Sequence, residues 1–393
     1  MRKAGFILGF GLLLAVAAVS IDWGFWSRYL ARPQTAADLS VDSYQPQFAV
    51  KGDYVPLARA SSSADKPFEA AVDIAEGYNS SALLIASGDE IILERYWDGA
   101  SASTRHLTFS FHKTISALLL GKAIDDGYIS GVDASVGNYI TRWEDDPRGR
   151  PTLRSVMQMS AGYSQPNSEG GPFSQAAYFS FGSDIEEATL AGDIAQSSEA
   201  PVFDYSDRNA QILGLALQSA LPSSYEAYLS QVLWQPLHAS DAAVTKRTEN
   251  GPTVTYCCLM ATAEDWLRIG MLLRDRGLFQ GRQVIPAQWI DDMTSPAAAN
   301  ANFGLFLWLG SPFNPERAYT SASPARVRSE HPFAVHDVLF LDGAGGQRIY
   351  ISRALDLVVV RIGEYRADWD DTRLFNAVAG ALQVTNLKSR KVT

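Results

Sequence analysis

The chain has 393 residues, 47% of them hydrophobic and 19% charged, which is typical of a folded protein with a substantial core and not of a disordered one. This length exceeds one average domain and favours two closely packed lobes. The net charge of −10, without any run of lysine and arginine, argues against nucleic acid as a partner.

The N-terminus carries an export pattern. Residues 1–3 form a small basic cap, and residues 4–21 contain no charge, which is just long enough to span a bilayer. Small residues at 15–17 offer a cleavage site, whereas the aromatic residues at 22–26 suit an interfacial anchor. We therefore expect residues 1–27 to be a signal peptide or a membrane anchor that tethers the protein. The remainder is expected to be periplasmic or otherwise extracytoplasmic, either membrane-anchored or secreted.

The first predicted elements follow a weakly patterned segment. Residues 28–66 are rich in Pro, Ala, Ser, Asp and Gln and are predicted to be a linker. Two strand-like runs, 81–86 and 90–96, flank the turn residues 87–89 and predict a β-hairpin.

A helix is predicted from Ser110 to residue 126, ending at Gly127. Ser110 and Lys113 are three positions apart and would lie side by side on one helix face. Burial disfavours the charged form of a lysine, and a neutral amine can take a proton from serine. The alternative interpretation is an N-capping serine beside a solvated lysine. His112 would point elsewhere on the helix and is interpreted as structural or as a residue that supports the catalytic groups from behind.

The remaining elements divide the chain. Residues 133–250 are predicted to be mostly helical. Later helices and strands predict one sheet domain, formed by 67–132 and 251–385, with 133–250 as an inserted helical domain. The predicted helices are 208–220, 263–273, 286–293 and 371–382, and the late strands are 303–309, 338–341, 347–351 and 355–362.

Two further places carry candidate chemistry. Tyr205 lies in a loop before a helix, where its hydroxyl could relay a proton; the alternative is a packed core tyrosine. The glycine-rich turn at 342–347 permits close backbone approach, so the N–H groups after it could bind a developing oxyanion; the alternative is a tight hairpin turn. Asp207 alone suits a helix N-cap.

Other types of site are disfavoured. The adjacent Cys257 and Cys258 are expected to be a buried or semi-buried thiol pair, because disulfides between sequence neighbours are uncommon. The histidines and cysteines lack zinc-ligand spacing. No Gly-x-Ser-x-Gly elbow is present, which argues against an α/β-hydrolase.

Taken in order, four stretches resemble the serine β-lactamase and penicillin-binding-protein superfamily. They are Ser110-Phe111-His112-Lys113, residues 153–162, Tyr205-Ser206-Asp207 and Gly345-Gly346-Gln347 with the strand that follows. The resemblance covers roughly residues 83–382. Within the superfamily, the chain looks most like class C-type esterases and 6-aminohexanoate-dimer (nylon oligomer) hydrolases.

The resemblance implies an α+β fold, with a central antiparallel sheet flanked by helices and an all-helical domain. It implies that Ser110 is the nucleophile of an acyl-enzyme, that Lys113 helps to deprotonate it and that Tyr205 passes the proton to the leaving group. The N–H groups of Ser110 and Gln347 would form the oxyanion hole. The implied substrate-binding residues are Tyr163, Asp207, Gly345 and Gly346.

Two departures from the family pattern bear on the chemistry. Asp207 stands where the family has asparagine; if it faces Lys113 it favours the ammonium form and would shift the base role toward Tyr205. Ala344-Gly345 stands where relatives carry a lysine or histidine that holds a substrate carboxylate. A neutral amide or ester therefore fits better than a β-lactam or a D-Ala-D-Ala terminus.

These observations predict an exported serine hydrolase that cleaves a small-molecule amide or ester without metal or cofactor. One alternative is a D,D-peptidase or β-lactamase acting on peptidoglycan-like or β-lactam substrates. An alternative of another class is a non-catalytic cell-envelope binding protein on the same scaffold.

Overall fold

The computed structural model describes residues 22–33, 40–60, 66–166, 168–194, 202–320 and 325–389. The predicted anchor or signal segment, up to residue 21, lies outside these residues. Within the described ranges, no helix combines the length and the apolar character that crossing a membrane requires.

The helix that carries Ser110 lies deep in the molecule. It is α4 (Phe111–Asp125), with Ser110 as its N-cap residue, and all but three of its side chains are buried. Helices α8 (Asp207–Ala220) and α10 (Ala263–Arg274) lie on different sides of it, and Phe111 meets Trp266 of α10 edge to face at 5.1 Å. Because α4 is buried on all sides, both lobes pack against it, and its first turn is held from several directions.

A seven-stranded sheet forms one lobe, with the order β10-β13-β14-β15-β3-β4-β2. Its neighbours pair antiparallel, except for the parallel pair β2–β4. The hairpin predicted from 81–96 is confirmed as β3–β4. The strands are β2 (Ala58–Arg59), β3 (Ser80–Ser87), β4 (Glu90–Tyr96), β10 (Trp308–Leu309), β13 (Leu339–Gly343), β14 (Gln347–Ser352) and β15 (Leu357–Gly363).

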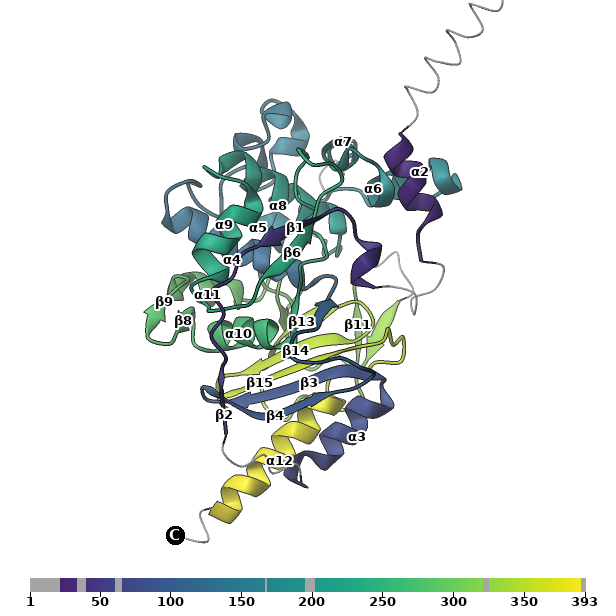
Figure 1. Cartoon of the computed structure of the whole chain (residues 1–393). Coiled ribbons are helices and arrows are strands. Elements are labelled where there is room, and N and C mark those ends of the chain that lie inside the picture. Colours follow the sequence, from purple (N-terminus) through teal and green to yellow (C-terminus); the bar gives the residue numbers. More distant parts are fainter. Residues whose placement is uncertain are drawn as a thin grey trace, which may run out of the picture.

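Helices cover both faces of this sheet, as Figure 1 shows. α10 packs on β14 and β15, and α3 (Glu69–Gly77) packs with α12 (Arg373–Ser389) on the opposite side. Gly270 of α10 faces Val358 so closely that a methyl group there would overlap its side chain. The arrangement confirms the predicted α+β class with a central antiparallel sheet flanked by helices.

Helices dominate the lobe between the two halves of the sheet. Most of these helices are short, and the loops between them reach the neighbourhood of Ser110. The elements are η4 (Val136–Asn138), η5 (Thr141–Trp143), η6 (Pro147–Gly149), α5 (Leu153–Met157), η7 (Gly171–Phe173), α6 (Gln175–Phe181), α7 (Ile185–Leu190), α8, α9 (Tyr225–Leu229) and η8 (Ser230–Trp234), with α11 (Ala287–Met293) following later in the chain.

Part of the predicted linker is folded. A second sheet has the order β1-β6-β7-β5, and its strand β1 (Gln47–Val50) pairs antiparallel with β6 (Ala242–Thr245). The partner strand is some 195 residues away in sequence, which local composition does not reveal. The remaining elements of the described residues are β5 (Arg105–Leu107), β7 (Met260–Thr262), the hairpins β8 (Leu278–Phe279)–β9 (Arg282–Gln283) and β11 (Glu316–Ala318)–β12 (Arg326–Arg328), η2 (Val41–Ser43), η3 (Lys66–Phe68) and α2 (Trp23–Leu30).

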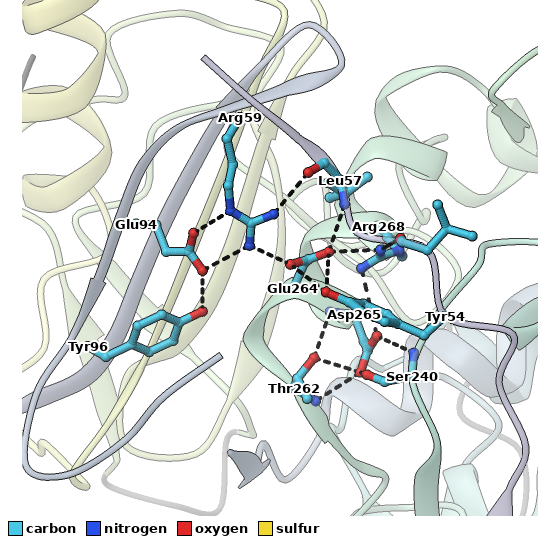
Figure 2. A network of polar contacts seen from close by, with 11 residues as sticks. Tyr54, Leu57, Arg59, Glu94, Tyr96, Ser240, Thr262, Glu264, Asp265 and Arg268 are labelled. Carbon is cyan, nitrogen blue, oxygen red and sulfur yellow. Dashed lines mark hydrogen bonds and ion pairs between the residues drawn. The ribbon is translucent and has the colours of Figure 1, made fainter. Parts of the chain in front are cut away.

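A polar network fastens the rest of this segment to the sheet lobe (Figure 2). The carboxylate of Glu264 on α10 accepts from the Leu57 backbone N–H at 2.9 Å and pairs with Arg59 and Arg268 at 2.9 and 2.8 Å. Arg59 also pairs with Glu94 of β4 at 2.9 Å. The buried charges in this network, Glu264 and Arg268, are thus paired with each other, which offsets the desolvation cost of burying them.

The strand predicted at 303–309 is shorter in the structure. Only Trp308 and Leu309 pair with β13, because Phe306 has a φ of +51° and breaks the extended run before it. Left-handed backbone is uncommon outside glycine and does not continue a strand.

Candidate active site

The first turn of α4 places an amine against a hydroxyl. Lys113 Nζ donates to Ser110 Oγ at 2.8 Å, to the Asp207 carboxylate at 2.7 Å and to the backbone oxygen of Tyr256 at 2.7 Å. The lysine side chain is only 2% exposed, whereas Asp207 is half exposed. An ammonium group has three N–H donors, and here three acceptors surround it. The predicted Ser110–Lys113 pair therefore exists, and Asp207 faces the amine.

The residue before Ser110 has a left-handed backbone conformation. Phe109 has a φ of +51°, and its carbonyl oxygen accepts from the backbone N–H groups of His112 and Cys258 at 3.5 and 3.2 Å. A bulky residue in the left-handed region costs about 1–3 kcal/mol and is retained where surrounding contacts enforce it. Here the strain lies immediately before Ser110, so the loop and the helix start are fixed together.

Tyr205 lies on the other side of Ser110. Its ring stacks on Trp308 with centroids 5.9 Å apart, and its backbone N–H donates to Tyr319 O at 2.9 Å. Burial raises the pKa of the Tyr205 phenol well above its usual value of 10, although a hydrogen bond with Ser110 lowers that pKa in part. Lys113 Nζ lies 5.0 Å from the centre of the ring. The phenol is therefore protonated near neutral pH, and its raised pKa makes it a weak acid.

Ser110 opens into a cavity of about 400 Å³ between the lobes. Its wall combines aromatic and small side chains, and the charged groups among the described lining residues are Asp207 and Asp342. Asp342 is buried and pairs with Arg317 at 2.7 Å and Arg348 at 2.5 Å, so its charge is already neutralised. The lining residues are Ser110, Gln165, Pro166, Ala176, Phe179, Ser180, Tyr205, Asp207, Tyr319, Asp342, Ala344, Gly345 and Tyr365.

The glycine-rich turn between β13 and β14 approaches Ser110 from the sheet. Gly343 lies against the backbone oxygen of Thr108, leaving no room for a side chain, and Gly345 has a φ of +76° with Tyr365 packed on it. Only glycine satisfies both the space and the left-handed conformation at Gly345. The turn thus brings the backbone of Gly345, together with Ala344, to the edge of the cavity.

The structure brings five of the predicted site residues together: Ser110, Lys113, Tyr205, Asp207 and Gly345. Tyr163, Gly346 and the side chain of Gln347 are not part of the lining of this cavity, and each has other partners.

Gln347 exchanges side-chain hydrogen bonds of 2.9 Å with the backbone of Gly363, so only its backbone N–H is available for the predicted role. Gly346 packs against Trp369. Tyr163 stacks on Trp143 at 5.6 Å and donates to the backbone oxygen of Arg148 at 2.6 Å, inside the helical lobe. Its hydroxyl is committed there, so the structure does not bring Tyr163 to the cavity.

The cysteines differ from the prediction: Cys257 and Cys258 form a disulfide and are not a thiol pair. The backbone there is unusual, since Cys258 has a φ of +80° and its N–H is held by Phe109 O. This local conformation cannot be inferred from composition. The segment also supplies Tyr256 O to Lys113 and Cys257 O to His112 Nδ1 at 2.8 Å, so it braces the first turn of α4 from behind.

His112 is structural, as the sequence indicates. Because Cys257 O can only accept, Nδ1 of His112 carries the proton, and Nε2 accepts from Tyr225 Oη at 3.0 Å. Burial lowers the pKa of His112 to about 4, which keeps the ring neutral.

Several residues at the site were not predicted. Tyr319 donates to Asp342 at 2.6 Å and packs on Tyr205, so it supports the phenol and lines the cavity. Asp342 is an acidic residue within an apolar strand, a signal that was available in the sequence. Tyr256 acts through its backbone oxygen, which leaves no mark in a sequence.

Comparisons with known proteins bear on the family and the fold of the chain. The chain matches the Beta-lactamase family over residues 67–369. A 6-aminohexanoate-dimer hydrolase from Paenarthrobacter ureafaciens is 23% identical over 300 residues, which cover 72% of each protein.

Two solved structures share the fold. A Bacillus anthracis protein provisionally named a 6-aminohexanoate-dimer hydrolase has a TM-score of 0.69 at 16% identity, covering 89% of this chain and 92% of that one. A class C β-lactamase from Rhodobacter sphaeroides has a TM-score of 0.55 at 15% identity, covering 82% and 100%. The predicted resemblance is confirmed, and because the family match spans most of its length, the protein belongs to the beta-lactamase family of hydrolases.

Proposed function

We propose that the protein is an exported serine hydrolase that cleaves an uncharged amide or ester through an acyl-enzyme on Ser110. The observation that carries this proposal is the 2.8 Å contact between Lys113 Nζ and Ser110 Oγ at the wall of a cavity that also exposes Tyr205. A nucleophile, a base and a proton donor within reach of one another are the minimum for acyl transfer.

The proposed acylation uses each group once. Lys113, in its neutral form, takes the Ser110 proton, and the oxygen attacks the substrate carbonyl. The backbone N–H groups of Ser110 and Gln347 bind the oxyanion. Tyr205 then donates its phenolic proton to the leaving amine or alkoxide, leaving an acyl-enzyme. The Lys113 ammonium beside the ring stabilises the resulting tyrosinate.

Deacylation reverses these roles. Tyrosinate at Tyr205 takes a proton from a water molecule, which attacks the acyl carbonyl, and Ser110 recovers its proton from Lys113 as the acid is released. The raised pKa of Tyr205 makes it a poor resting base but a strong one once it has lost its proton. We therefore propose that Lys113 is the first base. The contact between Asp207 and Lys113, taken alone, would have assigned that role to Tyr205.

The charge of the cavity supports a substrate without a carboxylate near the reacting carbonyl. Among the described lining residues, none is a lysine or arginine, and Ala344 stands at the edge where the sequence pattern of relatives places a cation. An unpaired carboxylate bound beside Asp207 would be repelled. We therefore place D,D-peptidase or β-lactamase activity second.

The test is reaction with a fluorophosphonate probe and turnover of short-chain p-nitrophenyl esters. Wild-type protein is expected to be labelled and to turn over the esters, while Ser110→Ala loses both. Ser155→Ala is the matched control, because Ser155 bonds to Thr152 on α5 outside the cavity. Labelling that persists in Ser110→Ala would overturn the assignment, and strong acylation by a labelled penicillin would favour the second candidate.

A further inference from the structure

An exposed apolar surface lies at one end of the helical lobe. Trp23 and Leu30 of α2 are 63% and 71% exposed, and Phe173 of η7 is 82% exposed. Trp26, between them on the same helix face, meets the Phe173 ring edge to face at 5.9 Å. We call Trp23, Trp26, Leu30 and Phe173 the α2 patch. Apolar side chains gathered in this way mark an interaction surface more often than isolated ones do.

The protein holds α2 firmly, so this exposure is not a consequence of a loose end. Asp22 caps the helix at Phe25 N and accepts from the Ser183 backbone N–H, both at 2.8 Å. Arg28 donates to Phe181 O at 2.7 Å and to Ser183 Oγ at 2.8 Å. Phe25 is buried. The helix thus uses one face for the fold and presents the other, aromatic face outward.

The α2 patch lies one helix away from the cavity of Ser110. Tyr178 and Phe181 of α6 pack on α2, with ring centroids 6.5 Å from Phe25 and 5.5 Å from Tyr29. Other residues of the same helix line the cavity: Ala176, Phe179 and Ser180. Because α6 separates the two, whatever covers the patch lies beside the cavity wall.

The sequence before α2 identifies the occupant. The eighteen residues 4–21 carry no charge and end directly before Asp22, the N-cap of α2. Such a run has the length of a bilayer span, and aromatic rings are enriched where a span meets the interface. The charged groups at the base of α2, Asp22 and Arg28, are already paired within the protein.

We infer that the α2 patch contacts the bilayer interface and holds the Ser110 cavity at the membrane surface. If the proposed function holds, the substrates include amphiphilic amides or esters that partition into the bilayer. This second part rests on that function, and the first part does not.

The first test uses the full chain reconstituted in phosphatidylcholine vesicles. An NBD fluorophore is attached at Phe173→Cys, and a control fluorophore at Glu69→Cys, an exposed position on α3 beyond the sheet. We expect blue-shifted NBD emission and quenching by nitroxide-labelled lipid at position 173 and neither effect at position 69. Equal, water-like emission at both positions would overturn the inference.

The second test separates the substrate class from the function itself. In the variant Trp23→Ser/Phe173→Ser, we expect hydrolysis of a soluble p-nitrophenyl ester to be unchanged and hydrolysis of a long-chain ester embedded in vesicles to fall several-fold. An unchanged embedded-ester rate would overturn the substrate part. If wild-type protein cleaves neither ester, the proposed function fails, while the fluorescence result still decides the membrane contact.

Discussion

At the scale of single residues, the site depends on how three acceptors share one amine. Asp207 and Tyr256 O hold the Lys113 amine beside Ser110, so its position is well defined. A carboxylate at position 207 accepts a charge-assisted hydrogen bond from the amine, which is stronger than one to a neutral amide.

His112 gives a pH dependence of stability that is separate from activity. Its pKa is lowered to about 4 by burial, whereas the unfolded chain has the usual value of 6.5. Between these values the unfolded state binds the additional proton, so stability falls as pH falls. Between pH 7 and pH 5 the loss is about 2 kcal/mol.

His112→Asn keeps a donor for Cys257 O but cannot be protonated. Denaturant unfolding of both proteins across this range measures the difference, and His106, buried in both, contributes equally to each. We expect the variant to lose about 2 kcal/mol less than the wild type between pH 7 and pH 5. Parallel pH curves would show that His112 is not held neutral.

At the scale of elements, the parts of the fold that depend on neighbouring residues could be predicted from local sequence patterns. The 110–126 helix, the 81–96 hairpin and the Tyr205 loop were all predictable, because periodicity and turn residues determine them. Four of the eight predicted site residues therefore converge on Lys113 or Ser110 in the structure, with Gly345 beside them.

Features that depend on distant or backbone partners were not predictable. β1 pairs with a strand some 195 residues away, Tyr256 contributes a carbonyl oxygen, and the Cys257–Cys258 disulfide accompanies a left-handed residue. Tyr163 occupies a matching position in sequence, yet its side chain points to Trp143, because orientation within a loop is decided by packing.

Two glycines in helices provide a matched pair. Gly270→Ala in α10 forces a methyl group into Val358, and overpacking a core typically costs about 1–3 kcal/mol. Gly380→Ala in α12 meets open space at an exposed position, and alanine is favoured over glycine there by up to about 1 kcal/mol. Chemical denaturation should therefore move the two midpoints in opposite directions. Equal shifts would contradict the packing of α10 on the sheet.

At the scale of the whole molecule, the cavity depends on both lobes. Ser110 and Lys113 come from the helix between the lobes, Tyr205 and Asp207 from the helical lobe, and Gly345 from the sheet. Strands from the first and the last third of the chain form the seven-stranded sheet beside this cavity. The Glu264 network fastens the N-terminal segment to the sheet lobe. The family match, over residues 67–369, includes every residue that lines the cavity.

The most direct measurement is the location of the acyl group during turnover. Full-length protein is quenched with acid while it hydrolyses a p-nitrophenyl ester and is then digested with trypsin. We expect the acyl mass on the peptide from His106 to Lys113, and its absence from that peptide in Ser110→Ala. An acyl group found on another peptide, or none found while the ester is still turned over, would contradict it.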